Sequence, residues 1–472
     1  MESPPHKKSS KRFAAFLIVA LLSAGSAAAA QSYETPPPAP VPAPAAPLPP
    51  AGVVPATLAL DVTGSPAADP AFLDLEIRKA LNRQIRPTLR PGASIVYGPI
   101  VPWPLFPLAA GTRAAVNVTV TITGDADSAP VSGVTTVALT NVPVAAQPPA
   151  VLYLSDDPEY VNGEGVVFRG SVSAERPARL YYYHSDVGAP RDLDVVLTAA
   201  TPSRVELTDS GAGPDLDVMS VGHAVTRDYL QQRLSGEGIV VDVVPGRPFV
   251  LRHALLLHGE VVAGTADVHV LAGGAVGISV VASPAGSRPE AYLGAPRLPY
   301  DGHRRHGTFD LRGYGAIAET YTAGGPPASA QYGGRATTPR NLDPSDDGRD
   351  YGDYGVVHRI TFTLVNPTDA AQLVYLYEKP LGGPVRSSFF VDGQLKELGC
   401  ARLPQPYRIA SYQLPAQTTG ATTTITMTDG GSFYPLEFGV TDAPPQPTTP
   451  PVGHPDGCSS NPPPFVEPPD NQ

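Results

Sequence analysis

Proline and glycine divide this chain into short pieces, and this division restricts its fold more than any other feature. The 472 residues include 57 prolines and 46 glycines, and proline ends helices and is excluded from the central strands of a sheet. Between these breaks, apolar and polar residues alternate with the period of a half-buried strand. In residues 114–122, Val116, Val118, Val120 and Ile122 alternate with Asn and Thr. The sequence therefore predicts a mainly β protein.

Proline is most concentrated near the two ends of the chain. It occupies nine of the fifteen residues 36–50 and eleven of the twenty-nine residues 444–472. Segments of this composition form extended spacers or stay disordered. We therefore predict a proline-rich linker over residues 31–53 and a proline-rich, disordered tail over residues 442–472.

The first folded segment is predicted to be a small α+β domain over residues 54–146. Asp69 followed by Pro70 is a typical helix start, apolar residues recur with helical period after it, and Pro87 ends the helix. Strands before and after it would form the sheet on which the helix packs.

Two further segments are predicted to be β-sandwich domains of immunoglobulin-like architecture, over residues 150–284 and 355–441. Both contain many short strands at the spacing expected of a sandwich. The first also contains a helical insertion, for which we expect Ser220 as the N-cap and Gly236 after the last turn. Residues 285–354 lie between the two and are rich in Gly, Pro, Arg, Asp and Tyr, so they are predicted to be an irregular loop region.

The N-terminus has the three parts of a secretory signal peptide. A basic stretch is followed by an apolar run and by small residues that end in Ala28-Ala29-Ala30, and residues 1–30 are therefore predicted to be removed after export. A retained membrane anchor is the alternative, because the uncharged stretch of residues 13–30 is just long enough to span a bilayer. No transmembrane segment is expected after cleavage, and the protein is predicted to be extracytoplasmic: secreted, periplasmic or on the cell surface.

The charge of the chain restricts its partners. The formal net charge is −11, and it becomes −14 when the four Lys/Arg and one Glu of residues 1–30 are removed. An acidic protein is a poor partner for nucleic acid. We therefore expect an envelope component, a protein or a glycan as partner, and no nucleic acid.

Cys400 and Cys458 are the two cysteines of the sequence. In an oxidising compartment they are expected to form a disulfide that ties the proline-rich tail to the last folded domain. Two free thiols or an intermolecular bond are the alternatives.

Residues 301–310 contain two histidines and two aspartates that could bind a metal. His303 and His306, with Asp301 and Asp310, offer imidazole and carboxylate ligands for a divalent metal such as zinc. Two arginines between the histidines and the glycines of the segment favour a polar loop instead.

A second cation hypothesis concerns calcium. The stretch Asp343-Pro344-Ser345-Asp346-Asp347-Gly348 resembles the start of an EF-hand loop, with Asp343, Asp347 and Asp350 as candidate ligands. Position twelve should be Glu and is Tyr354, so a solvated acidic turn is the alternative. No cofactor other than calcium or another divalent cation is suggested.

Tyrosines of the irregular region could form a binding surface. Tyr314, Tyr321 and Tyr332 could stack on sugar rings or contact a protein if they are exposed. The alternative is that they pack the region onto the neighbouring sandwich.

The sequence contains no convincing catalytic set, so no catalytic residue is assigned. A structural or adhesive protein of the cell envelope is the leading interpretation. A glycan- or protein-binding module that uses residues 285–354 is the alternative, and a metal-dependent hydrolase is the third hypothesis.

Overall fold

The computed structural model describes residues 47–102, 105–448 and 458. The described elements belong to the unit of residues 48–472. The predicted signal peptide and most of both predicted proline-rich flanks lie outside the described residues. Of the described residues, 51% lie in strands and 10% in helices, which confirms a mainly β protein with several sheets.

The N-terminal segment places one helix against a sheet, as its sequence pattern predicts. The carboxylate of Asp69 caps the helix by accepting the N–H of Ala71 at 2.7 Å, and Phe72, Ile77 and Leu81 are among the buried residues of its apolar face. The elements are β1 (Thr57–Thr63), β2 (Ala67–Ala68), α1 (Pro70–Ile85), the 3-10 turn η1 (Arg86–Thr88), β3 (Ser94–Val101), β4 (Leu108–Ala109), β5 (Arg113–Thr123) and β6 (Val131–Asn141).

The sheet of this segment continues into the next one. Strand β1 pairs on one side with β6 and on the other side with β13, where Asp61 lies opposite Val240. The long sheet runs in the order β17-β7-β10-β15-β12-β13-β1-β6-β5-β3, and β8 pairs with β10. Its further strands are β7 (Val151–Ser155), β8 (Tyr160–Val161), β10 (Ala178–Asp186), β12 (Ser203–Asp215), β13 (Gly238–Val243), β15 (Val261–Ala272) and β17 (His306–Asp310).

A second sheet shares a core with the long one. It runs in the order β14-β11-β16-β9, with β9 (Gly165–Val172), β11 (Arg191–Ala199), β14 (Phe249–Leu256) and β16 (Val276–Pro284). Strand β10 is buried along its whole length. Its Leu180 and Tyr182 belong to this shared core, whereas Tyr181 and Tyr183 point to the opposite face and pack near α2.

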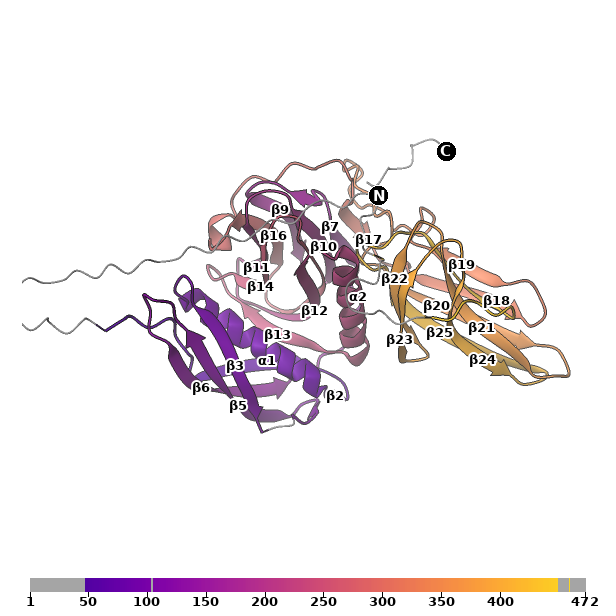
Figure 1. The fold of residues 1–472 in the computed structure, drawn as a ribbon, viewed down its shortest axis with the longest axis horizontal. Helices are drawn as coiled ribbons and strands as arrows, with labels where there is room; N and C mark the ends of the chain where they lie inside the picture. Colours follow the sequence, from indigo (N-terminus) through magenta and orange to yellow (C-terminus); the bar gives the residue numbers. More distant parts are fainter. Residues whose placement is uncertain (1–46, 103–104, 449–457, 459–472) are drawn as a thin grey trace, which may run out of the picture. The chain divides into compact units, whose positions relative to one another are not determined.

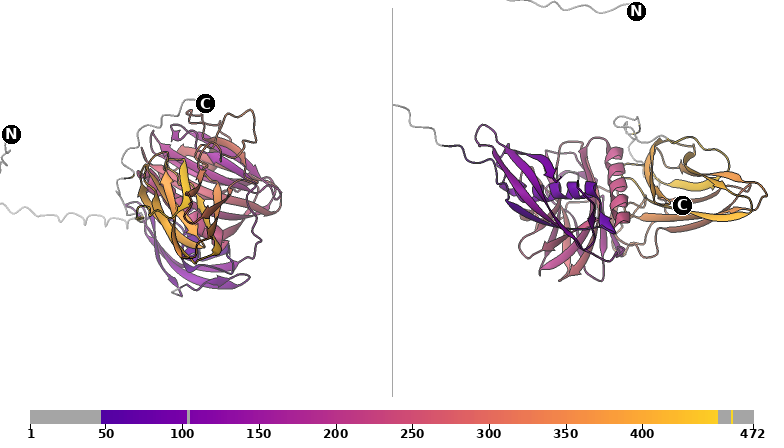
Figure 2. Two further views of the ribbon diagram at one scale, coloured as in Figure 1. Left: turned by 90° about the vertical axis from the view of Figure 1, so that its right-hand side faces the viewer. Right: turned by 90° about the horizontal axis from the view of Figure 1, so that it is seen from below.

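Helix α2 (Val218–Ser235) lies between the middle strands and the C-terminal strands (Figures 1 and 2) and contacts β12, β15, β22 and β25. Ser220 was expected to cap it, but the helix begins earlier, and the Asp217 carboxylate accepts the Ser220 N–H at 3.1 Å. The helix ends at Gly236, whose φ of 61° is left-handed, as expected of a C-cap glycine.

The C-terminal segment consists of two sheets that share a second core. Phe362 and Phe389 of one sheet both pack on Phe438 of the other, at ring distances of 6.3 and 5.5 Å. One sheet is β18 (Ala316–Thr322), β20 (Val357–Asn366), β25 (Thr418–Met427), β22 (Val385–Val391) and β23 (Gln394–Ala401). The other is β19 (Ala328–Tyr332), β26 (Leu436–Thr441), β21 (Gln372–Pro380) and β24 (Tyr407–Leu414).

Three strands, β17, β18 and β19, lie within residues 285–354, which were expected to be irregular. The 3-10 turn η2 (Pro289–Ala291) precedes them. Strand β18 adds to β20, and β19 adds to β26. Both are short, and β18 is largely exposed, so their local pattern is weak and pairing with distant strands decides their conformation.

A disulfide joins Cys400, on β23, to Cys458, 58 residues further along the chain. It connects a residue of the C-terminal tail with β23, an edge strand of the five-stranded C-terminal sheet. Among the described residues, no helix is long and apolar enough to cross a membrane.

Candidate functional site

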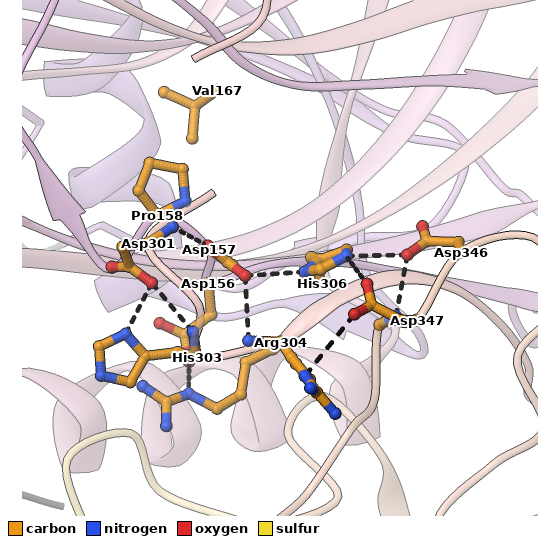
Figure 3. Close-up of polar contacts among 12 residues, drawn as sticks. Asp156, Asp157, Pro158, Val167, Asp301, His303, Arg304, His306, Asp346 and Asp347 are labelled. Carbon is orange, nitrogen blue, oxygen red and sulfur yellow. Dashed lines mark hydrogen bonds and ion pairs between the residues drawn. The ribbon is translucent and has the colours of Figure 1, made fainter. Parts of the chain in front are cut away.

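The candidate site lies where β17 meets β7. The two strands are antiparallel, with His306 opposite Ser155, so the turn after β7 and the loop before β17 lie side by side. A third stretch, residues 341–348, reaches the same place because the Leu342 N–H donates to the Thr308 carbonyl at 2.7 Å. Three segments far apart in the sequence therefore meet around one histidine (Figure 3).

That histidine, His306, is 1% exposed and lies between carboxylates. Its Nδ1 is 2.9 Å from Asp157 Oδ2, and its Nε2 is 2.8 Å from Asp346 Oδ1. The Oδ1 of Asp347 lies 3.8 Å from the same Nε2. The ring of Tyr300 stacks on the imidazole, with 3.6 Å between the ring centroids. The two hydrogen bonds and this stacking fix the orientation of the imidazole.

Asp157 organises the loop before β17. It is 1% exposed, and it accepts the N–H groups of Asp301 at 2.7 Å and Arg304 at 3.0 Å in addition to the His306 ring. Arg304 adopts a left-handed φ of 57°, which is uncommon for a residue other than glycine. These bonds satisfy the oxygens of a buried carboxyl group, whose burial without partners would be costly.

Asp301 and His303 form a separate pair. His303 Nδ1 lies 2.6 Å from Asp301 Oδ1, and the Tyr160 N–H donates to the other oxygen at 3.1 Å. Partial burial raises the pKa of Asp301, but the hydrogen bonds from His303 and Tyr160 outweigh it, and the net shift is downward. The bond to Asp301 raises the pKa of His303. The pair therefore favours the charged forms of both groups.

Asp156 and Arg305 form a second, more buried pair beside it. The Arg305 Nε donates to Asp156 Oδ2 at 2.6 Å, and the guanidinium also contacts Glu159. Burial raises the pKa of the Asp156 carboxyl well above its ordinary range, although the charge of Arg305 opposes the shift. Arg305 thus has a structural role in holding the two turns together.

Of the four predicted metal ligands, only His306 takes part in the cluster that could hold an ion. Asp301 and His303 bind each other, and Asp310, at the far end of β17, is bonded to the Arg312 guanidinium at 2.8 Å. Their proximity in sequence does not bring their ligand atoms together, because strand and turn direct them to different partners.

The predicted calcium ligands are also separated. Asp343 accepts the N–H and the hydroxyl of Ser345, and Asp350 is fully buried and accepts the Tyr354 N–H at 2.8 Å. Burial raises the pKa of Asp350 well above its ordinary range. Asp347 alone of the three approaches the site.

The structure instead brings together one predicted zinc ligand, one predicted calcium ligand and one residue that was not predicted. Among the described residues, His306, Asp346 and Asp347 each offer one ligand atom, and these atoms lie within 4.8 Å of one another. Asp346 was not among the predicted ligands. Its neighbour Asp347 was a predicted ligand, but forty residues separate Asp346 from His306. The backbone contacts of residues 341 and 342 with β17 bring the two side chains together.

A hollow of about 420 Å³ lies beside this set. Asp343, Asp346 and Asp347 line it, as does Tyr351, whose ring lies 5.3 Å from the guanidinium carbon of Arg335. Polar groups of both signs therefore face one concave surface.

The predicted tyrosine surface is not present as expected. Tyr321 and Tyr332 are 0% and 1% exposed and belong to the core of the C-terminal sheets, so an external ligand cannot stack on them. Tyr314 is 38% exposed. The short strands β18 and β19 turn the other two rings inward.

A second buried cluster, which the sequence did not indicate, lies under α2. His223 Nδ1 is 2.8 Å from Asp429 Oδ2, and its Nε2 is 2.9 Å from Glu397 Oε1. Burial lowers the pKa of His223, but the two carboxylates outweigh it and raise this pKa to about 9. The imidazolium therefore links the helix to the C-terminal sheets.

Comparison with known proteins gives no assignment. No model of a known protein family matches the chain, and no curated protein matches it either. Lac15 from a marine microbial metagenome is 11% identical, with 68% of this chain and 70% of that chain covered and a TM-score of 0.13. Tripeptidyl peptidase 2 is 8% identical over 75% of this chain and 29% of that chain, with a TM-score of 0.15. TM-scores this low carry no argument about fold or function.

Proposed function

We propose that this chain is an extracytoplasmic structural or adhesive protein, secreted or associated with the cell envelope, and built from immunoglobulin-like β-sandwich domains. The observation that carries this proposal is the disulfide between Cys400 and Cys458. Disulfides form and persist in oxidising compartments outside the cytosol, which agrees with the signal peptide expected from residues 1–30.

The side-chain contacts also support a structural role. The polar residues of the turn after β7 and of the loop before β17 mostly bind one another: Asp157 accepts backbone N–H groups, Asp301 binds His303, and Arg305 binds Asp156. The buried contacts of His223 couple α2 to the C-terminal sheets. Groups used in this way stabilise the packing of the chain.

Cell fractionation of the native host tests this proposal. We expect immunoblots to find the protein in the envelope fraction, at the mass of the chain without residues 1–30. A protein found in the cytosol, or with free thiols after rapid alkylation, would contradict it.

The hollow beside residues 339–351 favours a second candidate, a module that binds glycan. The ring of Tyr351 lies close to two guanidinium groups, at 5.3 Å from that of Arg335 and 5.6 Å from that of Arg349. Aromatic rings beside charged donors suit the stacking and hydrogen bonding of sugars. A glycan array with Tyr351→Ala, and Tyr314→Ala as the control outside the hollow, would test it: binding lost only in Tyr351→Ala supports the candidate, and equal binding by both variants rejects it.

A further inference from the structure

We propose that His306, Asp346 and Asp347 bind one divalent transition-metal ion, such as Zn²⁺, at the edge of the hollow. This site goes beyond the proposed structural role and does not depend on it. It combines His306, one of the four predicted zinc ligands, with Asp347, one of the three predicted calcium ligands, and with Asp346, which was not predicted to bind a metal.

The distances fit a single ion. Asp346 Oδ1 lies 2.8 Å and Asp347 Oδ1 lies 3.8 Å from His306 Nε2. Zinc binds nitrogen and carboxylate oxygen at about 2.0–2.2 Å, so an ion between these three atoms needs only small side-chain rotations. Asp347 is 69% exposed and is free to make such a rotation.

The hydrogen-bonding arrangement of the His306 imidazole favours a cation beside Nε2. A neutral imidazole carries one N–H, and the buried Asp157 carboxylate is placed to accept it from Nδ1 at 2.9 Å. The lone pair of Nε2 would then face Asp346 Oδ1 at 2.8 Å, and two lone pairs at this distance repel each other. A positive charge between them, either a second proton or a metal ion, removes the repulsion.

The charged side chains next to the ring of His306 are mainly carboxylates. Asp157, Asp346 and Asp347 contribute three negative charges, and Arg304, whose Nε lies 3.6 Å from Asp347 Oδ2, contributes one positive charge. A divalent ion between His306, Asp346 and Asp347 would offset the negative charge of the two carboxylates that bind it.

The residues that contact the imidazole resemble those around the histidine ligands of established metal sites. A ligating histidine commonly donates its other N–H to a carboxylate, which fixes the ring and increases its basicity. Asp157 is in this position, and the stacked Tyr300 ring further restricts the imidazole. Asp346 Oδ1 also accepts the Gly348 N–H at 2.9 Å, so this ligand is held in place by its own loop.

The donor set identifies the class of ion. Calcium and magnesium prefer oxygen ligands alone, whereas one imidazole with carboxylates suits zinc and related ions. Three protein ligands leave further coordination positions, which water from the adjoining hollow would fill.

Zinc titration of the full chain after dialysis against EDTA tests the site. By calorimetry at pH 7.5, we expect one equivalent of Zn²⁺ to bind, and Asp347→Asn to weaken the binding at least tenfold. Asp347 is exposed, so this variant keeps the fold, which circular dichroism would check. Asp343→Asn is the matched control, because Asp343 lines the same hollow but is bonded to Ser345, and its affinity should stay within twofold of that of the unaltered chain.

His303→Gln distinguishes this site from chance binding at a surface histidine and should also leave the affinity within twofold. The proposal is overturned if the unaltered chain binds no stoichiometric zinc. It is also overturned if Asp347→Asn binds zinc as well as Asp343→Asn does, or if His303→Gln loses the binding.

Discussion

His223 shows how one buried residue can stabilise the contact between α2 and the C-terminal sheets. Its ring lies between Asp429 and Glu397, with Ser388 Oγ 3.4 Å from Nδ1 and Arg227 3.9 Å from Glu397. Two N–H donors are needed for two carboxylates, so the charged form is the one that fits.

We predict that the stabilisation by His223 depends on pH. The folded-state pKa of about 9 is above the ordinary value of about 6.5. The contribution is therefore fully present below about pH 6.5 and is lost as the pH rises through about 9. Urea unfolding of His223→Gln should show a loss on the order of 3 kcal/mol near pH 6, by the conversion of the shift to free energy.

The difference between His223→Gln and the unaltered chain should disappear by about pH 10. His269→Gln is the control, because His269 lies outside this junction and contacts Glu206. A difference that stays constant over the whole pH range would show that the charge of His223 has no role.

A second residue-scale prediction concerns Glu378, which is completely buried. Burial raises its pKa to about 8, although bonds from Ser387 and Tyr332 act against the shift. A raised carboxyl pKa means that folding favours the neutral form, so stability falls as the pH rises from about 4.5 to about 8. Glu378→Gln removes the ionisation and should unfold at a higher temperature than the unaltered chain at pH 8.5.

Thermal unfolding of Glu378→Gln at pH 5 should differ little from that of the unaltered chain. Glu437→Gln is the matched control, since Glu437 lies on β26 and is 26% exposed. Equal effects of the two substitutions at pH 8.5 would contradict the proposed burial cost.

At the scale of elements, α2 fits against the C-terminal sheets through a close approach of backbone. A Cβ atom at Gly222 would lie 1.9 Å from the Gly430 carbonyl oxygen. Glycine in a helix interior otherwise costs stability, so its place here reflects packing rather than helix propensity.

We predict that Gly222→Ala destabilises the protein by about 1–3 kcal/mol, the range typical of overpacking. Alanine favours the helix by about 1 kcal/mol, but the clash with backbone cannot be relieved without moving α2. Gln231→Ala, on the exposed side of the same helix, should change the unfolding free energy by less than about 0.5 kcal/mol. A more stable Gly222→Ala variant would refute the close packing.

At the scale of the whole molecule, the disulfide closes a loop of 58 residues that contains β24, β25 and β26. Cross-linking stabilises mainly by restricting the unfolded chain. We predict that reduction lowers the unfolding free energy by about 2–4 kcal/mol, measured by denaturation with and without dithiothreitol. The unfolding free energy of the Cys400→Ser/Cys458→Ser double variant should equal that of the reduced chain and should not change when dithiothreitol is added. An unaltered chain that loses no stability on complete reduction would contradict this prediction.

Local patterns predicted much of the secondary structure. Alternation predicted β5, Asp69 and Pro70 predicted the start of α1, and Gly236 predicted the end of α2, because each depends on neighbours within a few residues. The start of α2 was misplaced, since Asp217 and Ser220 are both good caps and the packing of the helix decides between them. Division into separate domains remains a prediction, although β1 pairs with β13 across one expected boundary.

The sequence by itself determined that the chain is mainly β, because strand period and turn residues act over short range. Only the tertiary structure decided the site, because a ligand set depends on long-range pairing. It placed His306 beside Asp157 and Asp346. Asp301 and Asp310 instead bind His303 and Arg312. It likewise buried Tyr321 and Tyr332 through strands whose own pattern is weak.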